Sequence, residues 1–274
     1  MRAGQDNIDA SSAPLIEHLI ELRGRLIWAL CAFFIAFILC YFLSAHIFDI
    51  LAQPYLRAAR WRHIDLGPAG FNYTSPLGAF TTYLQIAAFG GMFLSFPVAA
   101  TQLYKFVAPG LYRNERQAFL PFLVASPLLF LLGALLVYFV AMPMLMWFSL
   151  GFVRAAASPD EVSVNFLNVM SEYLSTVMAL ILAFGLVFQM PVVTSLMVRA
   201  GMITTQSLVG KRKWAIVLAF VVAAVLTPPD PTSQIALAVP AILLYEVSII
   251  TARMIERKQA EQSSDTDPSG ERSA

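Results

Sequence analysis

The residues best placed to do chemistry are two carboxylates near the beginning of the chain. Between Pro14 and Leu26, apolar side chains recur at helical spacing, while Glu17 and Glu21 are four residues apart and share one face. Like charges at this spacing cost helix stability, which is a weak hint that a ligand compensates them. Periodicity alone predicts an interfacial amphipathic helix with a solvated charged face. The alternative is that Glu21 presents its carboxylate to a cationic ligand.

A third carboxylate, Glu115, lies in a short polar connection between two long apolar runs. It stands between two arginines in the segment Phe106–Arg116, and these arginines can simply neutralise it. Alternatively, Glu115 and Glu21 form a pair of acidic receptors, with Phe106 and Leu111 supplying apolar contact. Arginine is a suitable ligand for such a pair, because its guanidinium group binds carboxylates bidentately.

The sequence offers no set of residues that supports an enzyme. It contains neither a Gly-rich phosphate loop ending in Gly-Lys-Ser/Thr nor a His-Glu-x-x-His motif. Cys31 and Cys40 are nine residues apart on one predicted helix, about 13 Å along its axis, which is too far for a disulfide. We therefore expect no enzymatic activity, no cofactor and no metal.

Two polar residues fall inside apolar runs. An amide at membrane depth is costly to leave unpaired, so Gln189 is expected to face protein, a cavity or a partner helix. Whether its hydrogen bond is structural or functional stays open. The same reasoning applies to Glu246, unless this residue lies near the end of a short helix.

These side chains are positioned by a very apolar chain. Of 274 residues, 58% are hydrophobic and 13% charged, whereas soluble domains have about 45–50% apolar and about 25% charged residues. The net charge of +1 gives no reason to expect nucleic acid. Long uncharged runs favour helices over a barrel. The sequence therefore predicts an all-α integral membrane protein.

Six apolar runs predict six transmembrane helices, of which the last two are short. The runs cover 26–48, 80–104, 117–153, 173–198, 214–229 and 231–245, and the last reaches span length only if Glu246 is tolerated within a run to Ala252. The third would extend about 55 Å as a helix, beyond a hydrocarbon core of about 30 Å, so we expect it to tilt or protrude. A re-entrant hairpin is the alternative for the last two. Prolines in or beside the runs predict kinked spans; they are Pro97, Pro121, Pro127, Pro143, Pro191 and Pro240.

The distribution of basic residues predicts the orientation. Fourteen of the 18 Lys and Arg residues fall on the side that holds both termini, which the positive-inside rule places in the cytoplasm. Arg57, Arg60 and Arg62 are local exceptions on the other side. We divide the chain into a tail with the amphipathic segment (1–25), a six-helix domain (26–256) and a disordered cytoplasmic tail (257–274). No cleavable signal peptide is expected.

In combination, four motifs resemble the TatC family, the polytopic core subunit of the Sec-independent twin-arginine protein translocase. The motifs are His18–Arg25, Ser75-Pro76, Phe106–Arg116, and Leu226–Asp230 with Ser233-Gln234. The likeness extends from Ser12 to about Glu256 and includes the number and topology of the spans.

The resemblance implies a receptor that binds the Arg-Arg signal peptides of folded precursors at the cytoplasmic face of the bacterial inner membrane. It implies single-span TatA- and TatB-type partners, self-association in a larger complex, and transport driven by the proton-motive force. It assigns signal-peptide binding to Glu21, Arg23, Phe106, Leu111 and Glu115. It assigns assembly or transport to Pro54, Gln189, Asp230 and Gln234. Because Gln189 is neutral, a proton-relay role for it is in doubt.

A secondary transporter of a small solute is the alternative class. It would require ionisable groups at the midplane, broken helices in corresponding halves and repeat symmetry. Only Gln189 and Glu246 fit the first requirement, and the two halves do not match. A scaffold that collects single-span partners without affinity for signal peptides is a third possibility.

Overall fold

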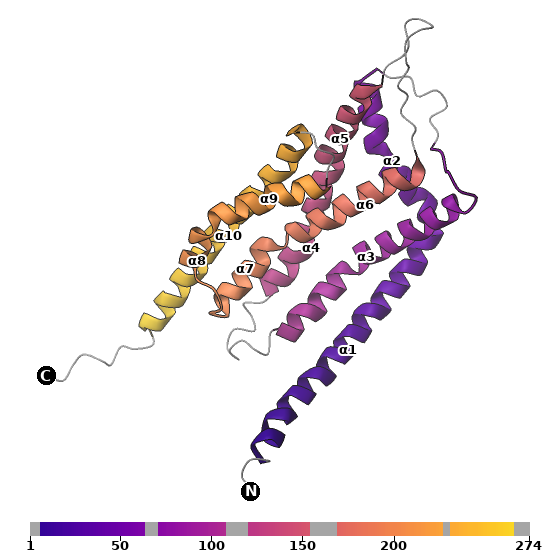
Figure 1. Cartoon of the computed structure of the whole chain (residues 1–274). Coiled ribbons are helices and arrows are strands. Elements are labelled where there is room, and N and C mark those ends of the chain that lie inside the picture. Colours follow the sequence, from indigo (N-terminus) through magenta and orange to yellow (C-terminus); the bar gives the residue numbers. More distant parts are fainter. Residues whose placement is uncertain (1–5, 64–70, 108–119, 154–168, 227–230, 266–274) are drawn as a thin grey trace, which may run out of the picture. The chain divides into compact units, whose positions relative to one another are not determined.

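The structure is a computed structural model that describes residues 6–63, 71–107, 120–153, 169–226 and 231–265. These ranges are almost entirely helical (Figure 1), which confirms the predicted all-α fold class. The helices are α1 (Asp6–Phe42), α2 (Ser44–Trp61), α3 (Gly78–Val107), α4 (Leu120–Leu136), α5 (Met142–Ser149), α6 (Met170–Val187), α7 (Met190–Arg199), α8 (Thr205–Gly210), α9 (Arg212–Leu226) and α10 (Pro231–Asp265).

The chain forms two compact units. The first comprises Met1–Phe48 and Tyr83–Pro127, and the second comprises Asp49–Thr82 and Leu128–Ala274. Helix α1, most of α3 and the beginning of α4 therefore belong to the first unit. The remaining helices, including most of α2, belong to the second.

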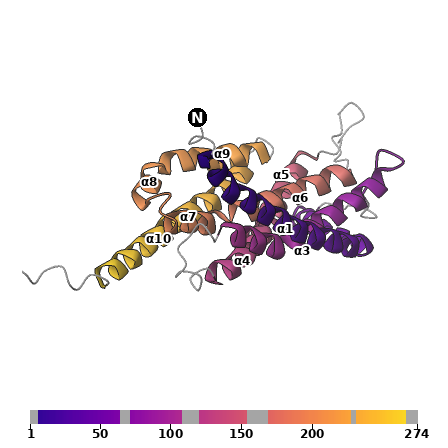
Figure 2. The same cartoon turned by 90° about the horizontal axis from the view of Figure 1, so that it is seen from below.

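Helices α1 and α3 lie side by side in the first unit (Figures 1 and 2). Two glycines of α3 make this close approach possible. A Cβ atom on Gly91 would lie 2.9 Å from the Cα atom of Phe37, and one on Gly90 would lie 2.7 Å from Sγ of Cys40. Cys40 is buried at this contact. The pair of glycines therefore sets the spacing between the two helices.

The core of the second unit is centred on α6. Leu174, Val177 and Phe184 recur at helical spacing and are almost completely buried. Gly133 of α4 packs against the backbone carbonyl of Phe184, where a Cβ atom would approach to 2.7 Å. The ends of α4 and α6 are therefore in direct backbone contact.

Two of the predicted kinks interrupt their helices. Pro143 has no N–H to donate to Phe139, and the helix widens just before it into a π-helical turn, Val137–Ala141, between α4 and α5. Pro191 likewise has no N–H for Val187, and α6 ends at that residue before α7 begins. Three other prolines lie inside helices that continue through them: Pro97, Pro127 and Pro240.

The first apolar run ends earlier than predicted. Residues 26–48 were expected to form one span, but α1 ends at Phe42 and α2 begins at Ser44. The hydroxyl of Ser44 donates to the carbonyl of Tyr41 at 2.8 Å, so it pairs with one of the backbone carbonyls at the end of α1. Helix α2, which buries one face and contains Pro54, was missed because only its first residues, up to Phe48, belong to the uncharged run.

The final helix is longer than predicted. Helix α9 has 15 residues, as the short run suggested, but α10 has 35 residues. Glu246 does not end its apolar segment, because Nη2 of Arg212 on α9 pairs with its carboxylate at 2.8 Å. Helix α10 also continues past the predicted boundary at Glu256 to Asp265, through residues of high helix propensity.

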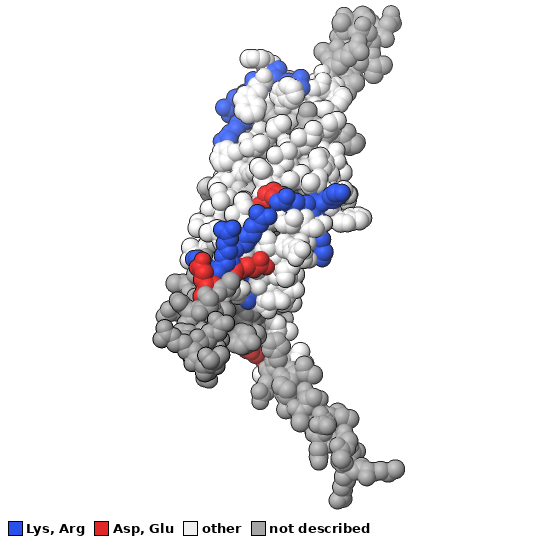
Figure 3. All heavy atoms as spheres, turned by 90° about the vertical axis from the view of Figure 1, so that its left-hand side faces the viewer, with Lys and Arg blue, Asp and Glu red and all other residues white. Residues whose placement is uncertain are grey.

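Among the described residues, five helical segments are long and apolar enough to cross a membrane. They are Leu19–Phe42, Gly78–Phe106, Phe122–Phe152, Met170–Arg199 and Gln234–Gln259. Helix α9, about 22 Å long, is shorter than a hydrocarbon core of about 30 Å, so the sixth span stays a prediction. Most of the described surface in Figure 3 is uncharged, and Lys and Arg gather in limited areas. Both observations are those of a membrane protein.

Candidate functional site

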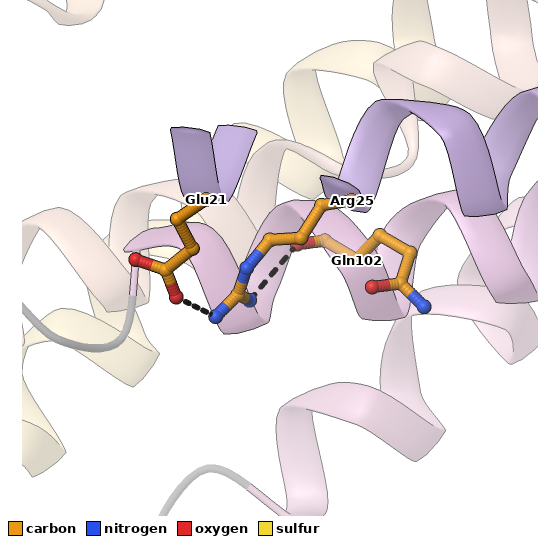
Figure 4. A network of polar contacts seen from close by, with 3 residues as sticks. All are labelled: Glu21, Arg25 and Gln102. Carbon is orange, nitrogen blue, oxygen red and sulfur yellow. Dashed lines mark hydrogen bonds and ion pairs between the residues drawn. The ribbon is translucent and has the colours of Figure 1, made fainter. Parts of the chain in front are cut away.

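The first part of the candidate site is formed by Glu21 and Arg25, one turn apart on α1. Their side chains form an ion pair, and Nη1 of Arg25 also donates to the backbone carbonyl of Gln102 on α3 at 3.4 Å (Figure 4). The side chain of Glu21 is 39% exposed and that of Arg25 is 20% exposed. Arg25 therefore links an accessible carboxylate to α3 within the first unit.

Arg25 is the residue of this site that the sequence analysis missed. A glutamate four residues before an arginine is a favourable arrangement on a helix, because the two side chains meet on one face. The sequence carries this signal at Glu21 and Arg25, next to the like-charge pair of Glu17 and Glu21.

The other residues assigned to signal-peptide binding are only partly described. Arg23 is exposed on α1, and Phe106 is partly buried in the last turn of α3, one turn after Gln102. Leu111 and Glu115 lie outside the described residues. The structure therefore brings Glu21 next to the end of α3 that carries Phe106.

The ends of α3 and α4 that flank residues 108–119 are also in contact. The side chains of Tyr104 on α3 and Ser126 on α4 are hydrogen-bonded, and both are buried. Both helix ends belong to the first unit, as does Glu21. The segment that contains Leu111 and Glu115 therefore begins and ends on helices of the unit that holds Glu21.

The residues assigned to assembly or transport lie at separate places. Pro54 is buried inside α2, and burial raises the pKa of the neighbouring Tyr55 hydroxyl. Nε2 of Gln234 on α10 donates to the backbone carbonyl of Phe220 on α9 at 3.3 Å. Asp230 lies outside the described residues.

Gln189 stands at the break between α6 and α7. It is 8% exposed, so its amide faces protein. Its backbone carbonyl accepts from the N–H groups of Val192 and Val193 at 3.0 and 2.9 Å, which starts α7.

Long apolar helices, five of them able to cross a membrane among the described residues, define a multi-pass α-helical membrane protein. Comparison with known proteins gives the family. The model of the family "Sec-independent protein translocase protein (TatC)" matches residues 17–240. The chain belongs to the TatC family, as the sequence motifs predicted.

Individual relatives agree with this assignment. The chain is 48% identical over 258 residues to the Sec-independent protein translocase protein TatC of Magnetococcus marinus, covering 93% of this chain and 90% of that protein. It is 36% identical to TatC of Escherichia coli strain K12, covering 88% of each. A crystal structure described as the twin arginine translocase receptor TatC superposes with a TM-score of 0.70 at 34% identity, covering 87% of this chain and 99% of that one.

The family assignment decides between the classes considered from the sequence. The chain is a component of the twin-arginine protein translocase and not an enzyme. It is a multi-pass membrane protein.

Proposed function

We propose that this chain is the translocase subunit that receives the Arg-Arg signal peptides of folded precursors at the cytoplasmic face of the bacterial inner membrane. The observation that carries the proposal is the exposed Glu21 carboxylate, held by Arg25 against α3. The similarity to solved structures described as twin-arginine translocase receptors supports it.

Chain length supports the pairing of Glu21 with Glu115. Glu115 follows Val107 by eight residues and precedes Leu120 by five. An extended chain spans at most about 3.5 Å per residue, so Glu115 lies within about 28 Å of one helix end and about 18 Å of the other. Both ends belong to the unit that holds Glu21, so the two carboxylates can approach one arginine pair.

The proposed binding step is an exchange of cations on Glu21. In the absence of a signal peptide, Arg25 occupies the carboxylate. An incoming guanidinium displaces it and forms two parallel hydrogen bonds with the carboxylate, while the second arginine of the doublet meets Glu115. Lysine lacks the planar fork and forms only a point contact, so the site selects arginine. Arg23, Phe106 and Leu111 contact the neighbouring residues of the signal.

The proposal extends to assembly. We place Pro54, Gln189, Asp230 and Gln234 in contacts for assembly or transport with TatA- and TatB-type single-span proteins and further copies of this chain. Exposed apolar side chains on α9 and α10 support this, because lipid or another helix must cover them. Both termini are cytoplasmic, α9 is a short sixth span, and the proton-motive force drives export.

Crosslinking of a precursor in native membranes tests the receptor function. A precursor with an Arg-Arg signal should crosslink to the wild-type chain, and the Glu21→Ala and Glu115→Ala variants should lose this crosslink while remaining inserted. Glu17→Ala, one turn earlier on the same helix, is the matched control and should keep it. A Lys-Lys precursor should crosslink poorly to all four. Unchanged crosslinks in both glutamate variants would overturn the proposal.

A further inference from the structure

Pro54 leaves a backbone acceptor of α2 without its usual donor. In an α-helix, the N–H of residue 54 would donate to the carbonyl of residue 50, but proline has no N–H. The carbonyl of Ile50 therefore has no helical partner. Pro54 itself is almost completely buried, whereas Ile50 is 57% exposed, so the carbonyl of Ile50 can accept from a side chain of a neighbouring helix.

A tyrosine from another helical segment donates to this carbonyl. The hydroxyl of Tyr138 lies 2.9 Å from the carbonyl oxygen of Ile50. The hydroxyl of Tyr173, at the beginning of α6, donates to the adjacent carbonyl of Leu51 at 2.8 Å. The two carbonyls differ, because the carbonyl of Leu51 has a helical donor, the backbone N–H of Tyr55, whereas the carbonyl of Ile50 has none. All of these residues belong to the second unit.

Tyr138 lies in the π-helical turn that precedes Pro143. In this turn the N–H of Met142 bonds to the carbonyl of Val137, five residues earlier. The next residue, Phe139, also faces α2, because the guanidinium of Arg57 lies 5.1 Å from its ring centroid and 5.7 Å from that of Tyr138. Two local departures from α-helix, one at Pro54 and one before Pro143, therefore meet at a single hydrogen bond.

We propose that Tyr138 is a positioning residue for Pro54: its hydroxyl replaces the amide donor that proline removes and so fixes α2 against the span that contains α4 and α5. The link to transport rests on the role in assembly or transport proposed above for Pro54. The hydrogen-bond replacement does not depend on that role.

Restoring a donor at residue 54 tests this replacement. Tyr138→Phe keeps the ring and removes only the hydroxyl. In the wild-type background it should lower the apparent Tm of the purified full chain by about 2–4 °C, the size expected for one lost hydrogen bond. In a Pro54→Val or Pro54→Ala background, the new N–H reaches Ile50, and Tyr138→Phe should lower Tm by less than half as much. Valine is included because it fills the buried volume of proline.

Tyr173→Phe is the matched control. It removes a hydroxyl from the adjacent carbonyl, whose helical donor exists in both backgrounds, so its effect on Tm should be the same with proline or valine at residue 54. Equal losses for Tyr138→Phe in both backgrounds, or no loss in either, would overturn the inference. If neither proline variant folds, hydrogen exchange decides. Tyr138→Phe should speed amide exchange within residues 44–61, and unchanged exchange would contradict the inference.

Export measurements separate this inference from the proposed function. Export of an Arg-Arg reporter should fall in Tyr138→Phe, while crosslinking of the precursor near Glu21 stays unchanged. If Tyr138→Phe lowers Tm more with proline than with valine at residue 54, but export does not change, the hydrogen-bond replacement stands and its role in transport is contradicted. If the wild-type chain gives no crosslink to the precursor near Glu21, only the proposed receptor function is contradicted.

Discussion

At the scale of single residues, we propose that Arg25 competes with the signal peptide for the Glu21 carboxylate. Arg25 pairs with Glu21 and also donates to the carbonyl of Gln102. An i, i+4 ion pair on a helix contributes about 0.2–0.5 kcal/mol, and the side chain of Glu21 is 39% exposed, so the pair orients the carboxylate and leaves it accessible. A stronger internal pair would exclude the signal peptide.

Removing this competitor should tighten signal-peptide binding. Arg25→Gln should raise the affinity for an Arg-Arg peptide by up to about twofold, the equivalent of the lost pair. Titration of a fluorescent peptide against the purified chain measures this. The gain should disappear in a Glu21→Gln background. A weaker affinity in Arg25→Gln alone would show that Arg25 contacts the peptide instead of competing with it.

The sequence identified several residues of the site but not their partners. Glu21 stands out by residue type and motif, and Pro54 was assigned through the family resemblance. Arg25 lies in the same motif as Glu21 but was not predicted to pair with it, and Tyr138 looks like an ordinary aromatic residue of a span. Tyr138 reaches Ile50 only because of a π-helical turn, and the width of a helical turn cannot be read from hydropathy. The relation of Glu21 to Glu115 stays a prediction.

At the scale of elements, close helix packing depends on glycines whose position the sequence does not explain. Gly91 allows α3 to approach the backbone of α1 at Phe37, whereas a Cβ atom added to Gly24 of α1 would have nothing within 4 Å. The two residues look equivalent in the sequence. Only the pairing of helices distinguishes them.

Substitutions at these two glycines should therefore have opposite consequences. Gly91→Ala should destabilise the protein by about 1–3 kcal/mol, because the Cβ atom meets backbone that cannot rotate away. Gly24→Ala should be neutral or stabilising, since alanine has the higher helix propensity. Thermal unfolding of both variants in one detergent provides the measurement. Equal stability would show that α1 and α3 do not pack with their backbones in contact.

The effect of each proline on its helix was also only partly predictable from the sequence. Six prolines predicted kinks, but only Pro143 and Pro191 coincide with an interruption in the helices, while α3 and α10 continue through Pro97 and Pro240. Neighbouring packing decides which helices break. The short final helix was predicted wrongly for a related reason, because the neutralising partner of Glu246 lies on another helix.

At the scale of the whole molecule, composition was sufficient for the fold class but not for the topology. An apolar chain with long uncharged runs must form membrane helices, because backbone groups in hydrocarbon need internal partners. The number of crossings depends on α9, which has only 15 residues. Hydropathy cannot distinguish a short span from a re-entrant segment of this length.

Labelling from the two sides of the membrane should settle the topology of α9. In a chain with Cys31 and Cys40 replaced by alanine, a cysteine at position 230 should react with an impermeant maleimide added from outside intact cells. A cysteine at Lys211 should react only after permeabilisation. Protection of position 230 in intact cells would favour the re-entrant hairpin and reduce the number of spans to four.

Little of the apolar part of α1 is buried within the chain, and this affects which substitutions the helix tolerates. Only 6% of its most apolar stretch is buried within the chain, so its outward side chains rest on surrounding hydrocarbon chains rather than on fitted protein neighbours. One bulky aliphatic or aromatic residue can replace another there at little cost to folding. Divergence among homologues should therefore concentrate on that face, while the narrow strip around Cys40 stays restricted to small side chains.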